Sequence, residues 1–187
     1  MARKRDADDE VDYEELDERL KAKLKADEEF KKYRNIVKFI GEAFDFDALE
    51  REIKSLHSGR KARTLSGKTP GAQMVMEADL QDGTNRSRLT QIRVDAVKHE
   101  AVLEEALDAI RSHITWRYAR YLPDGRTKSD RVGYVNNYLR KGIKLKKQLN
   151  TLGVMLEFYT KDIDQMGFRL QHTVQVLEMI YSRKENG

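Results

Sequence analysis

The residues best suited to chemistry in this 187-residue sequence lie between Ile114 and Arg131, in the stretch ITWRYARYLPDGRTKSDR. This stretch holds the only Trp of the chain, two Tyr and five Lys or Arg around a Pro-Asp-Gly turn. Cationic side chains can follow the phosphates of a strand while aromatic faces stack on its bases. The combination favours single-stranded nucleic acid over duplex reading, which uses a presented recognition helix or ribbon.

Basic residues continue past the turn into the next predicted helix. Residues 113–150 hold 10 basic and 2 acidic side chains, whereas residues 1–30 hold 7 basic and 12 acidic ones. Such a concentrated positive field favours a polyanionic partner. The predicted nucleic-acid-binding residues are Arg117, Arg120, Arg126, Lys128, Arg131, Arg140, Lys141, Lys144 and Lys147, and the predicted base-stacking residues are Trp116, Tyr118 and Tyr121. Alternatively, the rings cap a helical core and the cations only keep it soluble.

Other chemistries have little support in the sequence. Residues 62–69, ARTLSGKT, resemble a nucleotide-binding loop, but no strand precedes them and Pro70-Gly71 is a poor helix start. The four His do not occur four residues apart, and Cys is absent, so we expect no metal site. Asp162 and Asp164 point to different sides of a helix and do not form a catalytic pair. We therefore expect no enzyme and no cofactor.

Two long helices must position the basic-aromatic stretch. From Leu89 to His113 the sequence carries residues at three- and four-residue spacing, and this helix should end near Leu122, before the turn. The second helix, about residues 132–183, has the stronger pattern. Its stripe gives the predicted oligomerisation residues, Leu149, Leu152, Leu156, Tyr159, Ile163, Met166, Leu170, Leu177 and Ile180.

A helix of this length cannot bury its stripe on itself and needs partners. Further apolar residues, among them Val154, Phe158 and Phe168, lie off this stripe, which favours self-assembly. The alternative is a monomeric bundle closed by the N-terminal helices. These helices are predicted at residues 12–33 and 35–56, before a Gly/Ser-rich basic segment.

The predicted fold class is therefore all-α: a long antiparallel helical hairpin with an N-terminal helical arm, assembling through the C-terminal helix. The predicted domains are a charged helical arm at 1–57, a flexible basic linker at 58–73, and a hairpin at 74–187 for single-stranded DNA binding and oligomerisation. No run approaches ~18 apolar residues, so we expect no membrane span. The start of the chain lacks the apolar core of a signal peptide. The absence of Cys favours a cytoplasmic location.

Four segments resemble the UvsY-like recombination mediators of T-even-type phages. They are YEELDERLKAK near the N-terminus, EADLQDGTNRSRLTQIRVDAVKHEAVLEEALDAI, WRYARYLPDG, and LNTLGVMLEFYTKDIDQMGFRLQHTVQVLE. The resemblance covers roughly residues 77–187 and about ten residues near the N-terminus. Residues 25–73 have no counterpart in the family, and nothing is carried over onto them.

The resemblance implies a non-enzymatic factor that forms a ring through its C-terminal helices. Such a factor binds single-stranded DNA and helps to load a RecA-like recombinase against competition from the single-strand-binding protein. Arg117 and Arg120 are the nearest equivalents of the family's DNA-contacting residues. If the chain is phage-encoded, its location is the host cytoplasm. Two alternatives stay open, a structural coiled-coil scaffold and a nucleoid-type or RNA-binding protein.

Overall fold

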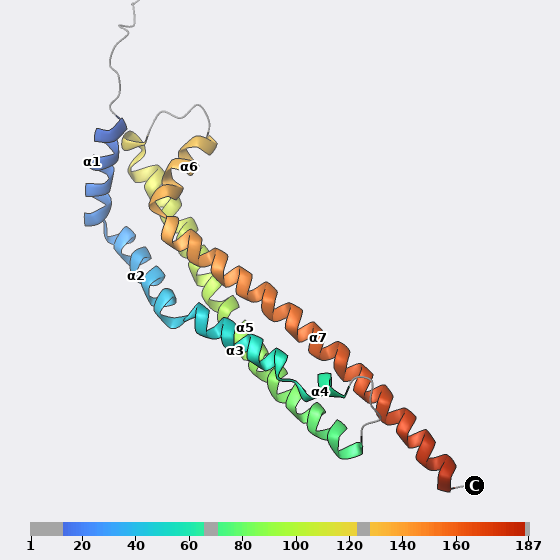
Figure 1. Ribbon diagram of the computed structural model, residues 1–187. Helices are drawn as coiled ribbons and strands as arrows, with labels where there is room; N and C mark the ends of the chain where they lie inside the picture. Colours follow the sequence, from blue (N-terminus) through green and yellow to red (C-terminus); the bar gives the residue numbers. More distant parts are fainter. Residues whose placement is uncertain (1–12, 66–70, 123–127, 186–187) are drawn as a thin grey trace, which may run out of the picture. The chain divides into compact units, whose positions relative to one another are not determined.

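The computed structural model describes residues 13–65, 71–122 and 128–185, and these residues are almost entirely helical (Figure 1). No strand occurs among them, which confirms the predicted all-α class. The elements are α1 (Tyr13–Ala26), α2 (Glu28–Ala43), α3 (Phe46–Ser58), α4 (Lys61–Thr64), α5 (Ala72–Arg117), the 3-10 helix η1 (Ala119–Tyr121), α6 (Lys128–Tyr138) and α7 (Arg140–Glu185).

The N-terminal helices begin and end at aspartates rather than at the predicted positions. A single helix over 12–33 is wrong, because the Asp27 carboxylate accepts a hydrogen bond from Phe30 N at 2.9 Å and starts a new helix. A single helix over 35–56 is wrong for the same reason, since Asp45 accepts from Ala48 N at 2.9 Å. An Asp side chain that satisfies a free N–H of the next helix competes with continuation of the previous one.

The chain forms two compact units, each built from segments that are distant in sequence. One contains the described residues of 1–41 and 102–145, and the other those of 42–101 and 146–187. Both α5 and α7 contribute to both units. The predicted domain ranges are drawn from composition along the chain, whereas these units are defined by contacts in space. The two divisions describe different things, so the predicted ranges remain a prediction.

The first unit buries one side of each of its helices. Its core residues are Leu20, Leu24, Tyr33, Ile40, Leu103, Leu107, Ile110, Ile114, Tyr118, Leu122, Val135, Leu139 and Leu145. The predicted continuous helix over 132–183 is wrong at Leu139, because α6 ends at Tyr138 and α7 begins at Arg140. The Tyr33 hydroxyl donates to the Leu139 carbonyl at 3.2 Å, and burial raises the pKa of Tyr33 to about 12.

Asp27 is the polar centre of the first unit. Its carboxylate accepts from the Tyr118 hydroxyl at 2.6 Å and lies 3.0 Å from His113 Nε2. Burial by itself would raise the pKa of Asp27, but hydrogen bonds from Tyr118, His113 and the Phe30 N–H together lower it below its usual value of 3.8. The ionised carboxylate therefore joins the α1–α2 junction to the end of α5.

The second unit packs α3 and α4 against α5 and α7. Ala62 and Leu65, around α4, form an apolar cluster with Val75 and Ala78 of α5 and Leu170 of α7. The remaining core residues of this unit are Phe44, Ile53, Leu89, Ile92, Ala96, Leu149, Leu152, Leu156 and Ile163. Ala62 and Leu65, inside the segment 58–73 predicted as a flexible linker, are therefore packed, whereas residues 66–70 of that segment lie outside the described residues.

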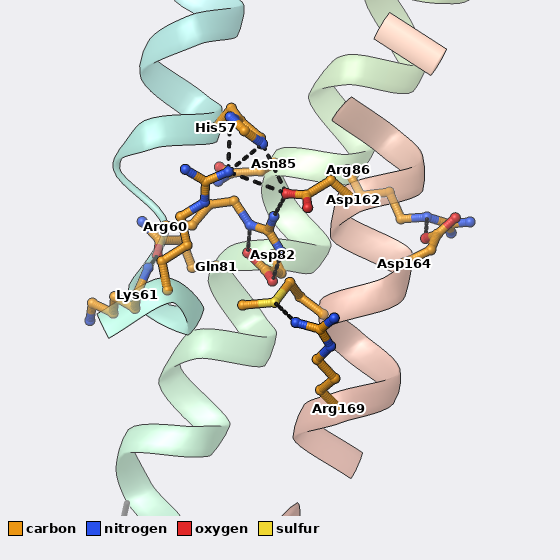
Figure 2. Close-up of polar contacts among 12 residues, drawn as sticks. His57, Arg60, Lys61, Gln81, Asp82, Asn85, Arg86, Asp162, Asp164 and Arg169 are labelled. Atoms are coloured by element: carbon orange, nitrogen blue, oxygen red, sulfur yellow. Dashed lines mark hydrogen bonds and ion pairs between the residues drawn. The ribbon is translucent and has the colours of Figure 1, made fainter. Parts of the chain in front are cut away.

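A buried ion network connects residues of three segments of the second unit: the start of α4, α5 and α7 (Figure 2). Arg60, only 1% exposed, donates from Nε and Nη2 to both carboxylate oxygens of Asp82, at 2.7 and 2.6 Å. Its Nη1 donates to Asp162 Oδ2 at 2.6 Å. The hydrogen bond with Asp82 raises the pKa of Arg60, so the guanidinium stays charged. Arg60 thus connects the start of α4 to α5 and α7.

Candidate nucleic-acid interface

The three aromatic residues of the predicted interface have different environments. Trp116, in the last turn of α5, is 84% exposed. Tyr121 is half-buried, and the Arg120 guanidinium lies 4.7 Å from the centre of its ring. An arginine that lies over an aromatic ring is held there by a cation–π interaction, and the outer face of its planar guanidinium stays accessible. Trp116 is therefore the ring best placed to stack on a base.

The prediction that Tyr118 stacks on a base is contradicted by its burial. Tyr118 is 7% exposed, and its hydroxyl donates to the buried Asp27. The cause is the way α5 ends. Tyr118 N still donates to Ile114 O at 3.1 Å, and Tyr121 N then donates to Tyr118 O at 2.9 Å, which tightens the backbone into η1. This turn directs Tyr118 inward and leaves Trp116 outside.

The two arginines before the turn are both exposed. Arg117 Nε lies 3.8 Å from Asp27 Oδ2, and its side chain is 65% exposed. The contact is long and the guanidinium is exposed to solvent, so Asp27 only weakly offsets the charge of Arg117. Among the described residues, Arg120 interacts with the Tyr121 ring alone. Both guanidinium groups can reach a phosphate without breaking a buried interaction.

A second group of cations begins α7. Arg140, Lys141 and Lys144 are exposed, and no carboxylate of the described residues pairs with them. They belong to the first unit together with Trp116, Arg117 and Arg120. Arg140, Lys144 and Lys147 lie four and three residues apart, on one side of the helix. Lys147 is also exposed, and it belongs to the second unit.

None of the remaining predicted cations has a side chain that the structure describes as exposed. Arg131, in α6, is half-buried and has an interaction within the chain. Lys128 is the first residue of α6, and only its backbone is described. Arg126 lies outside the described residues. The candidate interface of the first unit is therefore Trp116, Arg117, Arg120, Arg140, Lys141 and Lys144.

The predicted oligomerisation residues mostly lie inside the chain. Leu149, Leu152, Leu156, Ile163 and Leu170 are buried in the second unit. Tyr159 packs on His57 of α3, with ring centres 4.2 Å apart, and Met166 packs on the cluster around Leu170. Leu177 is half-buried and Ile180 is exposed. In this structure α3, α4 and α5 cover the stripe, as in the alternative of a bundle closed by N-terminal helices.

Sequence reasoning missed Arg60 and Asp82, the two fully buried members of the ion network. Arg60 stands between Gly59 and Lys61 in a stretch whose composition is typical of a loop. Asp82 lies before Gly83 in a polar stretch. No local pattern distinguishes either residue from its exposed neighbours, and only the contact between them indicates their role.

The described residues contain no group of His, Cys, Asp or Glu that could hold a metal ion. None of the described helices is both long and apolar enough to cross a membrane. In comparisons with known proteins, no protein-family model, curated protein or solved structure was found to match the chain.

Proposed function

We propose that this chain is a non-enzymatic recombination mediator that binds single-stranded DNA and promotes loading of a RecA-like recombinase. It would act in recombination, repair and replication, against competition from the single-strand-binding protein. Binding of a strand is supported by the first unit, and the mediator role by the family resemblance alone.

The exposure of Trp116 is the observation that carries the proposal. A Trp side chain exposed to 84% forgoes the burial that its large apolar surface would gain in the core. Here it is followed directly by Arg117, and Arg120 lies one turn further on. Stacking of a base on Trp contributes about 1–3 kcal/mol, and adjacent cations neutralise the flanking phosphates. A helix end built only for packing would direct its Trp inward.

The fold proposed for this function is an antiparallel hairpin of α5 with α6 and α7. In the second unit, Arg86 pairs with Asp164 and Arg93 with Glu157. In the first unit, Arg111 donates to Asn136. Also in the first unit, Leu107, earlier in α5, lies beside Gly142 of α7. Within each unit, positions later in α5 therefore meet positions earlier in α6 or α7, which is the order that a hairpin requires.

The proposal also includes self-assembly. A single protomer offers few contacts to a strand, whereas an assembly presents many copies to the same strand. The later contacts then become intramolecular and raise the overall affinity without new chemistry. Because the inner stripe of α7 is buried in its own chain, assembly would use another surface.

The single Trp of the chain allows a direct test. Titration with a short oligo-dT should quench Trp116 fluorescence, because a stacked base contacts its ring. In Arg117→Ala with Arg120→Ala, the dependence of log affinity on log salt should fall by about 0.7 for each lost phosphate contact. The matched control is Arg19→Ala with Lys32→Ala, which removes the same charge from exposed ion pairs elsewhere.

Unchanged Trp fluorescence at saturating oligo-dT, or an unchanged salt slope in the folded double variant, would rule out this interface. Duplex DNA and RNA of the same length serve as competitors. Stronger binding of either would favour a nucleoid-type or RNA-binding protein. A chain that binds none of them would be a structural scaffold, a function favoured by the exposed apolar residues of α5 and α7.

A further inference from the structure

A second row of residues follows α5 on the side opposite its buried residues. The row consists of Met76, Leu80, Gly83, Ser87, Thr90, Val94, Val97 and Ala101, separated alternately by four and three residues. All eight are exposed. At about 100° per residue, the row lies about half a turn away from the buried Leu89, Ile92 and Ala96. We call it the outer row of α5.

The centre of this row is hollow. Gly83 and Ser87 have small side chains, and they line a shallow open depression together with Leu80, Thr84 and Gln91. Asp79 and Arg88 also line it, and they supply its charged groups. A Cβ atom added to Gly83 would meet nothing within 4 Å, so the space over this helix is empty. The depression can therefore accept a large side chain from outside.

A corresponding row follows α7, again opposite its buried residues. It consists of Thr151, Val154, Phe158, Lys161, Gln165, Phe168, His172, Gln175 and Met179 at alternating spacings of three and four. Phe158 and Phe168 are 65% and 72% exposed. We call this the outer row of α7. It carries two large protruding rings, whereas the centre of the outer row of α5 carries the small residues Gly83 and Ser87.

The two outer rows share the repeat that brings helices together in knobs-into-holes packing. The row of α5 extends over about 38 Å and the row of α7 over about 42 Å, at 1.5 Å per residue. Their charges also match, because Arg88 of the depression is already paired with Glu52. The exposed carboxylate of Asp79 is therefore left to face the exposed guanidinium of Arg169, which follows Phe168. Arg169 donates to the sulfur of Met166, at 3.9 Å, and pairs with no carboxylate of the described residues.

The rows cannot meet within one chain. Both belong to the second unit, where the inner sides of α5 and α7 face a common core, as the contact of Val75 and Ala78 with Leu170 shows. The outer rows therefore face away from that core. Pairing α5 rows with each other would bring no aromatic ring to the depression, and pairing α7 rows would bring rings together without using it. Only contact between unlike rows places a ring over Gly83 and Ser87.

We propose that the outer row of α7 in one copy docks on the outer row of α5 in a second copy, with Phe158 or Phe168 in the depression. This contact is heterologous, so each copy keeps one free row of each kind. Such a contact repeats until it closes into a ring or extends as a filament. The inference deepens the proposed function, on which the biological role of the assembly rests.

Two variants test the two sides separately. Gly83→Glu fills the depression with a charge, and Phe158→Glu with Phe168→Glu replaces the rings. Gly83 and both Phe are exposed, so we expect the helical circular dichroism of the parent. Gly41→Glu is the control, because Gly41 is also exposed and a Cβ there meets nothing within 4 Å.

Sedimentation velocity should show an assembly for the parent and for Gly41→Glu, and a single protomer for each of the two variants alone. An equimolar mixture of the two variants should give a dimer and nothing larger. The intact α7 row of Gly83→Glu can dock on the intact α5 row of the Phe variant, and the other two rows are altered. A parent that sediments as one protomer, a variant that assembles like the parent, or a mixture without dimer would each overturn the proposal.

Binding of a short oligo-dT by the same variants separates this inference from the proposed function. Single-protomer variants that still quench Trp116 fluorescence would show an interface independent of assembly. A parent that assembles as described but does not bind the strand would contradict the DNA-binding function and leave the assembly contact intact.

Discussion

Arg60 shows how strongly one residue can depend on its surroundings. It lies in a basic, Gly- and Ser-rich stretch, yet its guanidinium is buried against Asp82 and Asp162. A buried ion pair with complete hydrogen bonding contributes modestly to stability, but removal of one partner leaves an uncompensated charge. Arg88 makes a similar two-bond pair with Glu52, at 2.6 and 3.1 Å, in a solvent-exposed position. The two pairs therefore differ chiefly in burial.

Arg60→Met should lower the free energy of unfolding by about 3–5 kcal/mol, because Asp82 stays buried without its partner. Arg88→Met should lower it by at most about 1 kcal/mol. Combining Arg60→Met with Asp82→Leu should recover most of the loss. Urea unfolding followed by helical circular dichroism measures all three variants. Equal losses for Arg60→Met and Arg88→Met would show that the buried network has no special role.

At the scale of elements, the start of α7 depends on a close contact with α2. A Cβ atom on Gly142 would lie 3.1 Å from Tyr33 Cζ and 3.2 Å from Leu107 Cδ2, and still closer to the Tyr33 hydroxyl. The glycine permits Tyr33 to reach the Leu139 carbonyl, between α6 and α7. By contrast, a Cβ on Gly153 or Gly167 would meet nothing within 4 Å.

Gly142→Ala should therefore destabilise the protein by about 1–3 kcal/mol through overpacking, although alanine favours helix. Gly153→Ala, the matched control, should stabilise it by up to about 1 kcal/mol. Tyr33→Phe removes the closest atom, so Gly142→Ala should cost less in that background. Thermal unfolding of the four variants checks this. Stabilisation by Gly142→Ala in the parent would show that Tyr33 yields without cost.

At the scale of the whole molecule, the proposed strand binding and the proposed assembly should be coupled through strand length. A strand that covers one protomer uses one interface, whereas a long strand can contact several copies at once. The avidity from such linkage reaches about 10²–10⁴-fold when the geometry allows simultaneous contact. The candidate interface lies in the first unit and both outer rows lie in the second, so the two can be changed independently.

We therefore expect Gly83→Glu to bind a short oligo-dT with the affinity of the parent but a long strand about 10²-fold more weakly. Fluorescence anisotropy over a series of strand lengths measures the difference at a fixed salt concentration. An equal loss at every length would mean that Gly83→Glu damages the interface itself. An equal affinity at every length would mean that assembly does not contribute to binding.

Much of the fold could be predicted from the sequence, because helical periodicity is local. The stripe from Leu149 to Leu170 and the end of α5 before the turn follow directly from the spacing of apolar residues. The breaks at Asp27, Asp45 and Leu139 could not be predicted in this way. At Asp27 and Asp45, capping of the next helix competes with continuation of the previous one, and charge pattern and spacing do not decide between them. At Leu139, the carbonyl accepts a hydrogen bond from the Tyr33 side chain, 106 positions away.

The candidate interface was predicted less completely. Spacing and charge placed Trp116, Arg117 and Arg120 together, but they could not show that Tyr118 turns inward to Asp27, which lies 91 residues away. Periodicity likewise indicated apolar residues on two sides of α7 without indicating which side the chain itself covers.

The sequence by itself determined the helices, their charge distribution and the presence of a basic-aromatic helix end, since these depend on neighbours within a few residues. Only the tertiary structure decided which apolar stripe is core and which is exposed. It also decided that Tyr118 is buried while Trp116 is not, and that Arg60 is an internal ion. The physical reason is that burial is set by contacts between distant segments, and an exposed and a buried side chain can have the same local sequence pattern.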